Sequence, residues 1–327
     1  MQKLTPSANS RETKTREKKT QVKRIKRNIS GVLLIDKPLG YSSNQALQKV
    51  KWLYQAAKAG HTGTLDPLAT GLLPICLGEA TKFAQYLTDA DKAYVATIKL
   101  GATTTTGDAE GDILSTAEVN VTRAVFDAAC QQFLGEISQV PPMYSALKHE
   151  GKALYTYARE GVEIERKARI VHIRHIATTR LALDVAEIVV TCSKGTYIRT
   201  LAEDIGLLLG CGAHLIALRR TATAGYDIAH SMTLEQLEAL TLAQRDAALM
   251  PVDSAIEDMP KVILKEDAAY YLLQGQPIWQ SGKIPDSDLR LYDMQDRFLG
   301  LGYLQADGKI APKRLLQNNS NENSHLK

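Results

Sequence analysis

The sequence GHTGTLDPLATG, residues 60–71, is the most unusual stretch of the chain and guides the interpretation of its fold. Its three glycines, one proline and several small polar residues exclude a regular helix or a central strand, so we predict a long ordered loop. Loops of this kind often carry functional residues. From these residues alone, Asp66 is either a functional carboxylate or an aspartate before proline that caps a surface turn. A phosphate-cradling loop is disfavoured, because no Gly-Lys-Ser/Thr follows the glycines.

The segments around this loop alternate irregularly between strand and helix patterns. The apolar run 31–36 suits a buried strand and is closed by a turn at residues 37–40. Ser42 and Gln45 form a capping-box pattern that predicts a helix after this turn. This mixed order favours an α+β domain around a largely antiparallel sheet over a doubly wound nucleotide-binding fold. Further strands are predicted at Tyr94–Leu100, Arg169–Ile176 and Ala186–Cys192, and further helices at Thr122–Leu134 and Thr196–Leu209.

Composition changes divide the chain into four parts. Residues 1–29 hold ten basic and two acidic side chains with few large apolar ones, so we expect a disordered tail with a net charge of +8. Pro251 and Pro260 flank a polar segment that indicates a domain boundary with a separate core on either side. We therefore expect a main domain at residues 30–255, a small β-rich domain at 256–316, and a frayed tail at 317–327. Strands of the small domain are predicted at Leu289–Tyr292 and Phe298–Leu304, with a hairpin turn at Asp307-Gly308.

Composition also excludes several classes of protein. The 327 residues carry a net charge of +4, so the chain without its tail is near −4 and nucleic-acid binding by the folded body requires local basic patches. The four cysteines form no CxxC pair, which argues against a zinc site and a disulfide framework. No run of about eighteen apolar residues is present, and the N-terminus lacks the apolar core of a secretory signal. We expect a cytoplasmic protein without a membrane segment.

Three further segments contain candidate functional residues. Tyr197 and Arg199 lie where an apolar strand ends and a helix begins. A cation in the first turn of a helix is unfavourable, so we expect Arg199 to have an anionic partner, and a bidentate pair would hold a carboxylate ionised. From its local sequence, Tyr197 can be interpreted as a core aromatic residue. Tyr94 is either a core aromatic residue or a ring on which a base stacks. Arg219 and Arg220 suit phosphate contacts, although such a pair is usually a solvated face.

An ordered set of motifs resembles the bacterial tRNA pseudouridine-55 synthases, the TruB-type family. Together with the loop around Asp66, the set comprises KPLGYSS at 37–43, KAYVATIKLG at 92–101, MYSALK at 143–148, KGTYIRTLAEDIG at 194–206 and GCGAHLIALRR at 210–220. The similarity covers residues 31–316. The C-terminal part is similar to the RNA-binding PUA module of these enzymes, at Gly275-Gln276, residues 298–302 and residues 312–314. The resemblance implies a pseudouridine synthase catalytic domain followed by a PUA-like domain.

The resemblance also implies roles for individual residues. Asp66 matches the catalytic aspartate, Tyr94 the aromatic that stacks on the everted base, and Arg199 the arginine paired with the carboxylate. Residues that match those surrounding the flipped uridine, or filling the space it leaves, are His61, Tyr197 and Leu218. Residues expected to support the active-site loop or to contact RNA are Lys37, Pro38, Arg219 and Arg220.

The resemblance implies isomerisation of the T-loop uridine at tRNA position 55, which the enzyme must extrude from its stack. Because the base detaches and rejoins the same sugar, we expect neither a cofactor nor a metal. The expected partner is the tRNA T stem-loop, bound by a monomer that requires no protein partner. One alternative is a guide-RNA-dependent pseudouridine synthase, which works in a multi-protein particle. A second is a non-catalytic tRNA-folding or RNA-binding protein, which the basic tail and the PUA-like module would suit.

The basic tail gives a first test. We predict that removing residues 1–28 weakens binding to specific and non-specific RNA alike, because a flexible cationic arm neutralises phosphates without reading sequence. Each lost phosphate contact should flatten the slope of log affinity against log salt by roughly 0.7 to 0.9. Salt titrations of the full-length and shortened proteins check this. Identical slopes would show that the tail is an inert extension.

Overall fold

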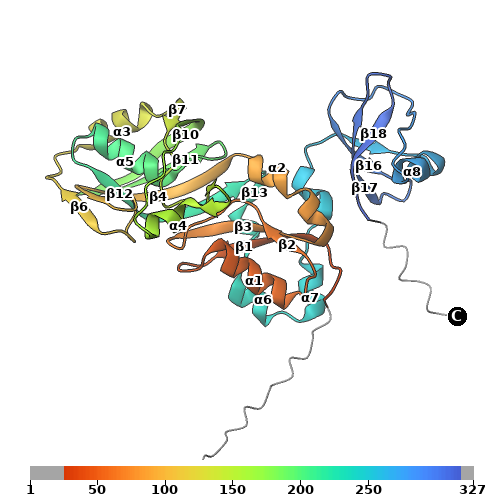
Figure 1. Cartoon of the computed structure of the whole chain (residues 1–327), viewed down its shortest axis with the longest axis horizontal. Coiled ribbons are helices and arrows are strands. Elements are labelled where there is room, and N and C mark those ends of the chain that lie inside the picture. Colours follow the sequence, from red (N-terminus) through yellow and green to blue (C-terminus); the bar gives the residue numbers. More distant parts are fainter. Residues whose placement is uncertain (1–25, 318–327) are drawn as a thin grey trace, which may run out of the picture.

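The computed structural model describes residues 26–317 as an elongated molecule with a small domain at one end (Figure 1). Residues 1–25 and 318–327 of the two predicted tails lie outside the described residues. Residues 26–29 differ from the prediction, because the Arg27 backbone N–H donates to the Gln55 carbonyl at 2.7 Å and its guanidinium pairs with Asp246 at 2.5 Å. Ile29 packs against the main core. The deletion that tests the tail should therefore end at residue 25.

The main domain is built on one ten-stranded sheet that is mixed and largely antiparallel, which confirms the predicted α+β class. Its parallel pairs are β1 with β14 and β3 with β12, and the other pairs are antiparallel. The path of eight strands runs β14 (Met232–Thr233), β1 (Gly31–Lys37), β3 (Ala69–Leu77), β12 (Ala213–Thr223), β4 (Lys92–Leu100), β11 (Val185–Cys192), β10 (Arg169–Ala182) and β7 (Gly135–Gln139). Off this path, β2 (Ala59–His61) pairs with β3 and β13 (Tyr226–Asp227) pairs with β12.

Both faces of the sheet are buried near β1, as its continuous apolar run predicts. Leu33 and Ile35 face the core formed with the larger helices, whereas Val32 and Leu34 face a second core. The helices on the first face are α1 (Ser43–Leu53), α3 (Arg123–Gln131), α5 (Ile198–Leu208) and α6 (Leu234–Ala239). The second core contains η1 (Gly78–Lys82), α2 (Ala84–Asp89), η2 (Ile228–His230) and η3 (Val252–Ile256), while α7 (Leu242–Ala247) follows α6 in the chain.

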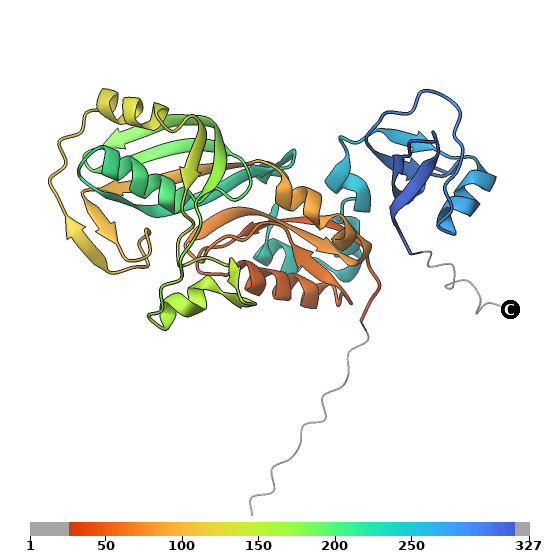
Figure 2. The same cartoon turned by 45° about the horizontal axis from the view of Figure 1, so that its top comes forward.

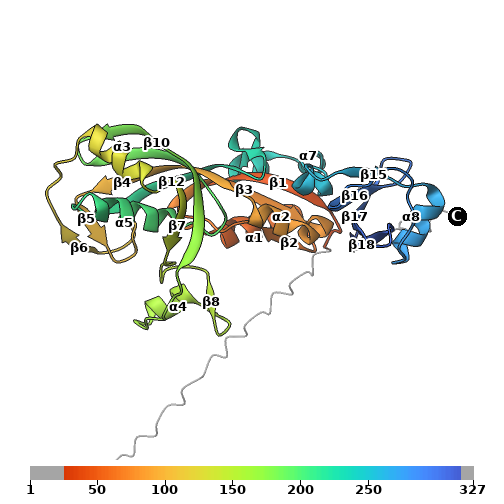
Figure 3. The same ribbon diagram turned by 90° about the horizontal axis from the view of Figure 1, so that it is seen from above.

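Two excursions leave the sheet. Residues 140–168, between β7 and β10, project away from it with β8 (Lys148–His149), β9 (Lys152–Ala153) and α4 (Leu154–Arg159), as Figure 3 shows. The hairpin of β5 (Ala102–Thr104) and β6 (Ile113–Thr116) follows β4. No helix among residues 26–317 is long and apolar enough to cross a membrane.

The local signals for the helices were accurate to within a few residues. The predicted capping box at α1 is present, with the Ser42 side chain bound by the Gln45 N–H and the Gln45 side chain by the Ser42 N–H. Helix α5 begins at Ile198, two residues later than predicted, because Tyr197 has an extended backbone at the N-cap. Helix α3 is shorter than predicted and ends at Gln131.

The predicted loop at residues 60–71 is shorter than expected, and its two ends are strands. Residues 60–61 belong to β2 and residues 69–71 begin β3, so the irregular part is residues 62–68. The prediction failed at Gly71 because this glycine serves a strand contact. Gly71 has a φ of +103°, and a Cβ there would lie 2.3 Å from the Arg220 carbonyl oxygen of the neighbouring strand. Glycine therefore permits the parallel approach of β12 to β3.

The C-terminal β domain, residues 261–315, lies at the end of the molecule opposite the hairpin of β5 and β6 (Figure 2). The two predicted strands are present at Asp288–Tyr292 and Phe298–Leu304, and Asp307-Gly308 forms the turn between the last two strands. The predicted boundary at residue 256 falls at the end of η3. The elements of this domain are β15 (Lys261–Ile263), α8 (Glu266–Leu273), β16 (Asp288–Tyr292), β17 (Phe298–Leu304) and β18 (Ile310–Leu315), and the sheet order is β15-β16-β17-β18.

The expectation of separate cores is wrong at the domain junction. Leu301 of β17 is fully buried in the same cluster as Leu34 and Leu72 of the main sheet. The rings of Phe298 and Phe83 lie 5.5 Å apart across the junction. The polar pattern near residue 255 concealed this contact, because the shared apolar residues come from strands distant in sequence.

This shared core predicts that the two domains stabilise each other. Leu301→Ala should lower the free energy of unfolding by about 2–5 kcal/mol, because it leaves a cavity in the shared cluster. Hydrogen exchange followed by mass spectrometry should then speed up in β1 and β3 as well as in the C-terminal β domain.

Leu289→Ala is the matched control, because Leu289 is equally buried but belongs to a cluster formed only by residues of the C-terminal β domain. It should speed exchange in that domain alone. The same exchange pattern in both variants would contradict a shared core.

Candidate active site

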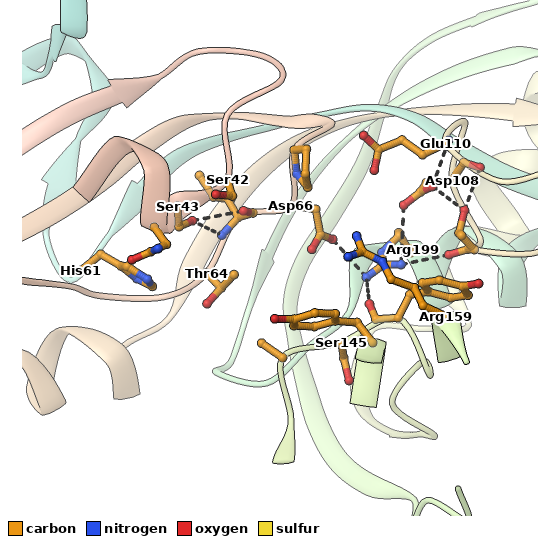
Figure 4. Close-up of a pocket in the computed structure, with 17 residues that line it drawn as sticks. Ser42, Ser43, His61, Thr64, Asp66, Asp108, Glu110, Ser145, Arg159 and Arg199 are labelled. Carbon is orange, nitrogen blue, oxygen red and sulfur yellow. Dashed lines mark hydrogen bonds and ion pairs between the residues drawn. The ribbon is translucent and has the colours of Figure 1, made fainter. Parts of the chain in front are cut away.

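Asp66 lies at the centre of the irregular segment 62–68, between β2 and β3. The segment is held by the start of α1, where the buried Ser43 hydroxyl donates to the Leu65 carbonyl at 3.1 Å and accepts from the Leu65 N–H at 2.8 Å. The Gly40 N–H donates to the Pro67 carbonyl at 2.9 Å. These bonds fix the residues on either side of Asp66, whose carboxylate is directed toward Arg199 (Figure 4).

Arg199 is the partner of Asp66, at 3.0 Å between the arginine Nη2 and the aspartate Oδ2. The expected anionic partner is therefore present, but the pair is not bidentate. The other terminal nitrogen, Nη1, lies 3.5 Å from the Asp108 carboxylate and donates to the Thr106 carbonyl at 2.9 Å, while Nη2 also donates to the Tyr144 carbonyl at 2.6 Å. One guanidinium thus joins the Asp66 segment, the turn after β5 and the excursion 140–168.

Burial differs sharply among these charges. The Arg199 side chain is 5% exposed and that of Asp108 is 3% exposed, whereas Asp66 is 41% exposed. Partial burial raises the pKa of Asp66, the Arg199 cation opposes this rise, and the Asp108 carboxylate adds to it. Asp66 is therefore the accessible carboxylate of the group.

Two cavities meet at Asp66. The first, the Tyr94 cavity, has a volume of about 620 Å³ and is lined by Tyr94, Tyr197 and Arg220 among others. The second, the His61 cavity, has a volume of about 500 Å³ and lies between the start of α1, the Asp108 turn and α4 (Figure 4). The residues that line both are Thr64, Asp66, Ser145, Ala146 and Arg199.

The Tyr94 cavity brings together the two predicted tyrosines. Tyr94 lies on β4 with most of its ring buried, and this burial raises the pKa of its hydroxyl. Tyr197 is the N-cap of α5, and its backbone is held by the buried Gln139 side chain. The Tyr197 N–H donates to Gln139 Oε1 at 3.0 Å, and Gln139 Nε2 donates to the Tyr197 carbonyl at 3.3 Å. This amide pair orients the residue that directly precedes the helix of Arg199.

His61 and Lys37 occupy different positions relative to the cavities. His61 lines the His61 cavity, and its buried Nδ1 has no hydrogen-bond partner among residues 26–317. Burial and the nearby Arg220 cation lower the pKa of its ring. Lys37 is fully buried and donates to the Pro38 carbonyl at 3.0 Å and to the Tyr41 carbonyl at 2.5 Å. These bonds hold the turn before α1, and the side chain lines neither cavity, so the geometry gives no support to the predicted substrate contact.

The last three predicted residues lie side by side on β12. Leu218 is partly buried beside Ala69. Arg219 is exposed and paired with Asp36 at 2.6 Å. Arg220 is 1% exposed and donates to the carbonyls of Leu72 at 2.6 Å and Gly63 at 3.1 Å. Its burial and these bonds do not favour the predicted phosphate contact, and the residue braces the Asp66 segment.

Three segments of the chain match descriptions of one protein family. Residues 51–198 match the family described as TruB family pseudouridylate synthase (N terminal domain). Residues 199–257 match the tRNA pseudouridylate synthase B C-terminal domain, and residues 260–316 match Pseudouridine synthase II TruB, C-terminal. The chain belongs to the TruB family of pseudouridine synthases.

Relatives share this family over almost the whole chain. The tRNA pseudouridine synthase B of Methylobacillus flagellatus is 63% identical over 91% of this chain and 98% of its own length. That of Stutzerimonas stutzeri is 53% identical over 91% of this chain and 99% of its own length. The solved structure of a Cbf5-Nop10-Gar1 complex is 27% identical, with a TM-score of 0.66 over 88% of this chain and 84% of that one. These likenesses confirm the family resemblance seen in the sequence and the predicted pseudouridine synthase fold. They also indicate that the chain is a tRNA-modifying isomerase.

The sequence analysis did not identify Asp108, which is the second carboxylate that contacts Arg199. Its Oδ1 accepts from the Thr106 hydroxyl at 2.5 Å and from the Glu110 N–H at 3.1 Å, which are the bonds of an ordinary aspartate turn. The sequence analysis did not single out this segment, and nothing in its local pattern indicates the ion pair, which joins residues far apart in the chain. Among residues 26–317, no group of three or more His, Cys, Asp or Glu side chains is arranged to hold a metal ion.

The charges around Asp66 predict how the activity of this family member depends on pH. If ionised Asp66 is required, the rate of pseudouridine formation falls as pH drops through the Asp66 pKa. Asp108→Asn removes a negative charge that raises this pKa, so the acidic limb of the rate profile should move to lower pH. Single-turnover rates measured across the acidic range test this shift.

Asp127→Asn is the control, because Asp127 is a partly exposed residue of α3 whose ion pair is with Arg123 on the same helix. Its profile should coincide with that of the wild type. An acidic limb that stays in place or moves upward in Asp108→Asn would exclude electrostatic coupling between the two carboxylates.

Proposed function

We propose that this chain isomerises uridine 55 in the T loop of tRNA to pseudouridine, with Asp66 as the catalytic carboxylate. The observation that carries the proposal is the position of Asp66. This acidic residue lines both cavities, and it is the more exposed of the two carboxylates that contact Arg199. A carboxylate in this place reaches a nucleoside in the Tyr94 cavity while the adjoining RNA passes through the His61 cavity.

The reaction exchanges one bond of the target nucleotide for another. The bond between C1′ of the ribose and N1 of the base breaks, the base turns, and a bond from C1′ to C5 forms. N1 then carries a proton and C5 loses one, so the product has the same atoms as the substrate. An ionised Asp66 assists as a nucleophile or by stabilising positive charge on the sugar, and Arg199 favours the ionised form.

Binding must first extrude the base from its stack, at a cost of a few kcal/mol. The Tyr94 cavity supports this step, because it combines a mostly buried aromatic ring with room for a nucleoside. We assign base stacking to Tyr94 and contacts around the everted uridine to Tyr197 and His61. Leu218 and Arg219 complete the proposed RNA contacts beside the loop.

The proposal also holds that the chain acts as a monomer without a guide RNA. The relatives at 63% and 53% identity are each named tRNA pseudouridine synthase B, whereas the similar Cbf5 structure, at 27% identity, is of a complex with other proteins. We propose residues 30–255 as the catalytic domain and residues 256–316 as a PUA-like RNA-binding domain. Modification of an unmodified tRNA transcript by the purified chain alone distinguishes this function from a guide-dependent one.

The decisive test replaces Asp66 with asparagine, which keeps the size of the side chain and removes its charge. Purified wild-type protein should form pseudouridine at position 55 of an unmodified tRNA transcript. Asp66→Asn should show no turnover above background while binding the tRNA within about fivefold of wild type, since the change in one polar contact is worth roughly 1 kcal/mol.

Chemical mapping of pseudouridine along the transcript reads the position and the activity together. Modification at another uridine would overturn the assignment of position 55. Turnover by Asp66→Asn would overturn its catalytic role, and absence of modification by the wild type would favour a non-catalytic RNA-binding protein.

A further inference from the structure

Five cationic side chains line the Tyr94 cavity, and they fall into two groups. Arg199, Arg220 and Lys92 are buried and bound to protein oxygens. Lys92, for example, donates to the carbonyls of Leu87, Thr88 and Ala90 at the end of α2. These three cannot turn toward a ligand without leaving buried carbonyls unpaired.

The remaining two cations, Arg169 and Lys194, are exposed. Arg169 is the first residue of β10 and forms no ion pair or side-chain hydrogen bond within residues 26–317. The Lys194 side chain is 60% exposed and pairs with Asp89 at 3.0 Å, an arrangement that exchanges readily with solvent. Both therefore keep their charge available at the cavity.

The backbone holds these two residues on the same rim. The His172 N–H donates to the Ser193 hydroxyl at 2.8 Å, and the Ser193 N–H donates to the His172 carbonyl at 2.8 Å, so the turn of Lys194 is fixed to β10. At the start of β10, Arg169 pairs in register with Gln139, whose amide holds Tyr197. The two cations are thus positioned by the same framework that positions the cavity.

We propose that Arg169 and Lys194 form a phosphate subsite that binds a phosphodiester next to the everted nucleotide. This rests on the proposed function, because a nucleotide turned into the Tyr94 cavity stays linked to the RNA by two phosphodiesters at the cavity mouth. A guanidinium binds two phosphate oxygens at once, and the lysine supplies a second charge. The subsite would place the ribose of the target nucleotide against Asp66.

The test combines a double substitution with RNA that lacks one charge. We expect R169Q/K194Q to bind a T-arm RNA on the order of tenfold more weakly, as for loss of hydrogen bonds to a charged group. The slope of log affinity against log salt should flatten by roughly 0.7 for each lost contact. A T-arm RNA with a single neutral methylphosphonate, 5′ or 3′ of the target uridine, identifies the phosphate.

At the phosphate that occupies the subsite, methylphosphonate should weaken binding by the wild type and leave binding by R169Q/K194Q unchanged. The matched control is R180Q/K99Q. Arg180 is an exposed residue further along the same strand, and Lys99 is a half-buried lysine at the other end of β4 that is paired with Asp184. This control should respond to methylphosphonate as the wild type does.

Two results would overturn the subsite. One is equal affinity of R169Q/K194Q and R180Q/K99Q for unmodified RNA. The other is a methylphosphonate penalty of the same size in R169Q/K194Q as in the wild type at both positions. These readouts are of binding alone, so they remain interpretable if the wild type fails to form pseudouridine at position 55, a result that would refute only the proposed function.

Discussion

The arrangement of the site depends on one buried guanidinium. Removing Arg199 from water is costly unless its donors find acceptors and its charge is balanced. It meets both requirements by binding two carboxylates and two backbone carbonyls, which come from the Asp66 segment, the turn at Asp108 and the excursion at Tyr144. Backbone bonds to Leu215 of β12 also hold the Asp108 turn. The guanidinium links this turn to the other two segments at the place where the two cavities meet.

The sheet also holds the Asp66 segment in place, through strand β12. Strand β12 runs parallel to β3, so Arg220 lies opposite Gly71 and extends beneath the segment to the Gly63 carbonyl. The absence of a side chain at Gly71 allows this approach, and Ser43 closes the segment from the α1 side. Asp66 is thus placed by contacts with β12, α1 and α5, although its own neighbours in sequence have no regular structure.

Prediction from the sequence succeeded where the signal was local. The capping box at Ser42, the strands of alternating or continuous apolar residues, and the misplaced first-turn cation at Arg199 each reflect physics acting within a few residues. It failed where long-range pairing decided the outcome. Arg219 and Arg220 are equivalent as a dipeptide, but alternation along β12 sends one to solvent and the other into the interior. The sequence did not predict the shared core at Leu301 either, because its residues come from segments that are far apart in the chain.

The charge balance of the site explains why a lysine is buried beside it. Asp66 and Asp108 carry two negative charges against one on Arg199, and RNA phosphates arriving at the cavities would add more. The second cation is Lys37, whose positive charge lowers the pKa of Asp66, while burial lowers the pKa of Lys37 itself to about 8. Its amine is fixed by the Pro38 and Tyr41 carbonyls, so it offsets the negative charge from a buried position that lines neither cavity. In the proposed complex, RNA would exclude water from the exposed side of Asp66. The carboxylate would then lose solvation, and both cations would become more effective at keeping it ionised because the surrounding dielectric would be lower.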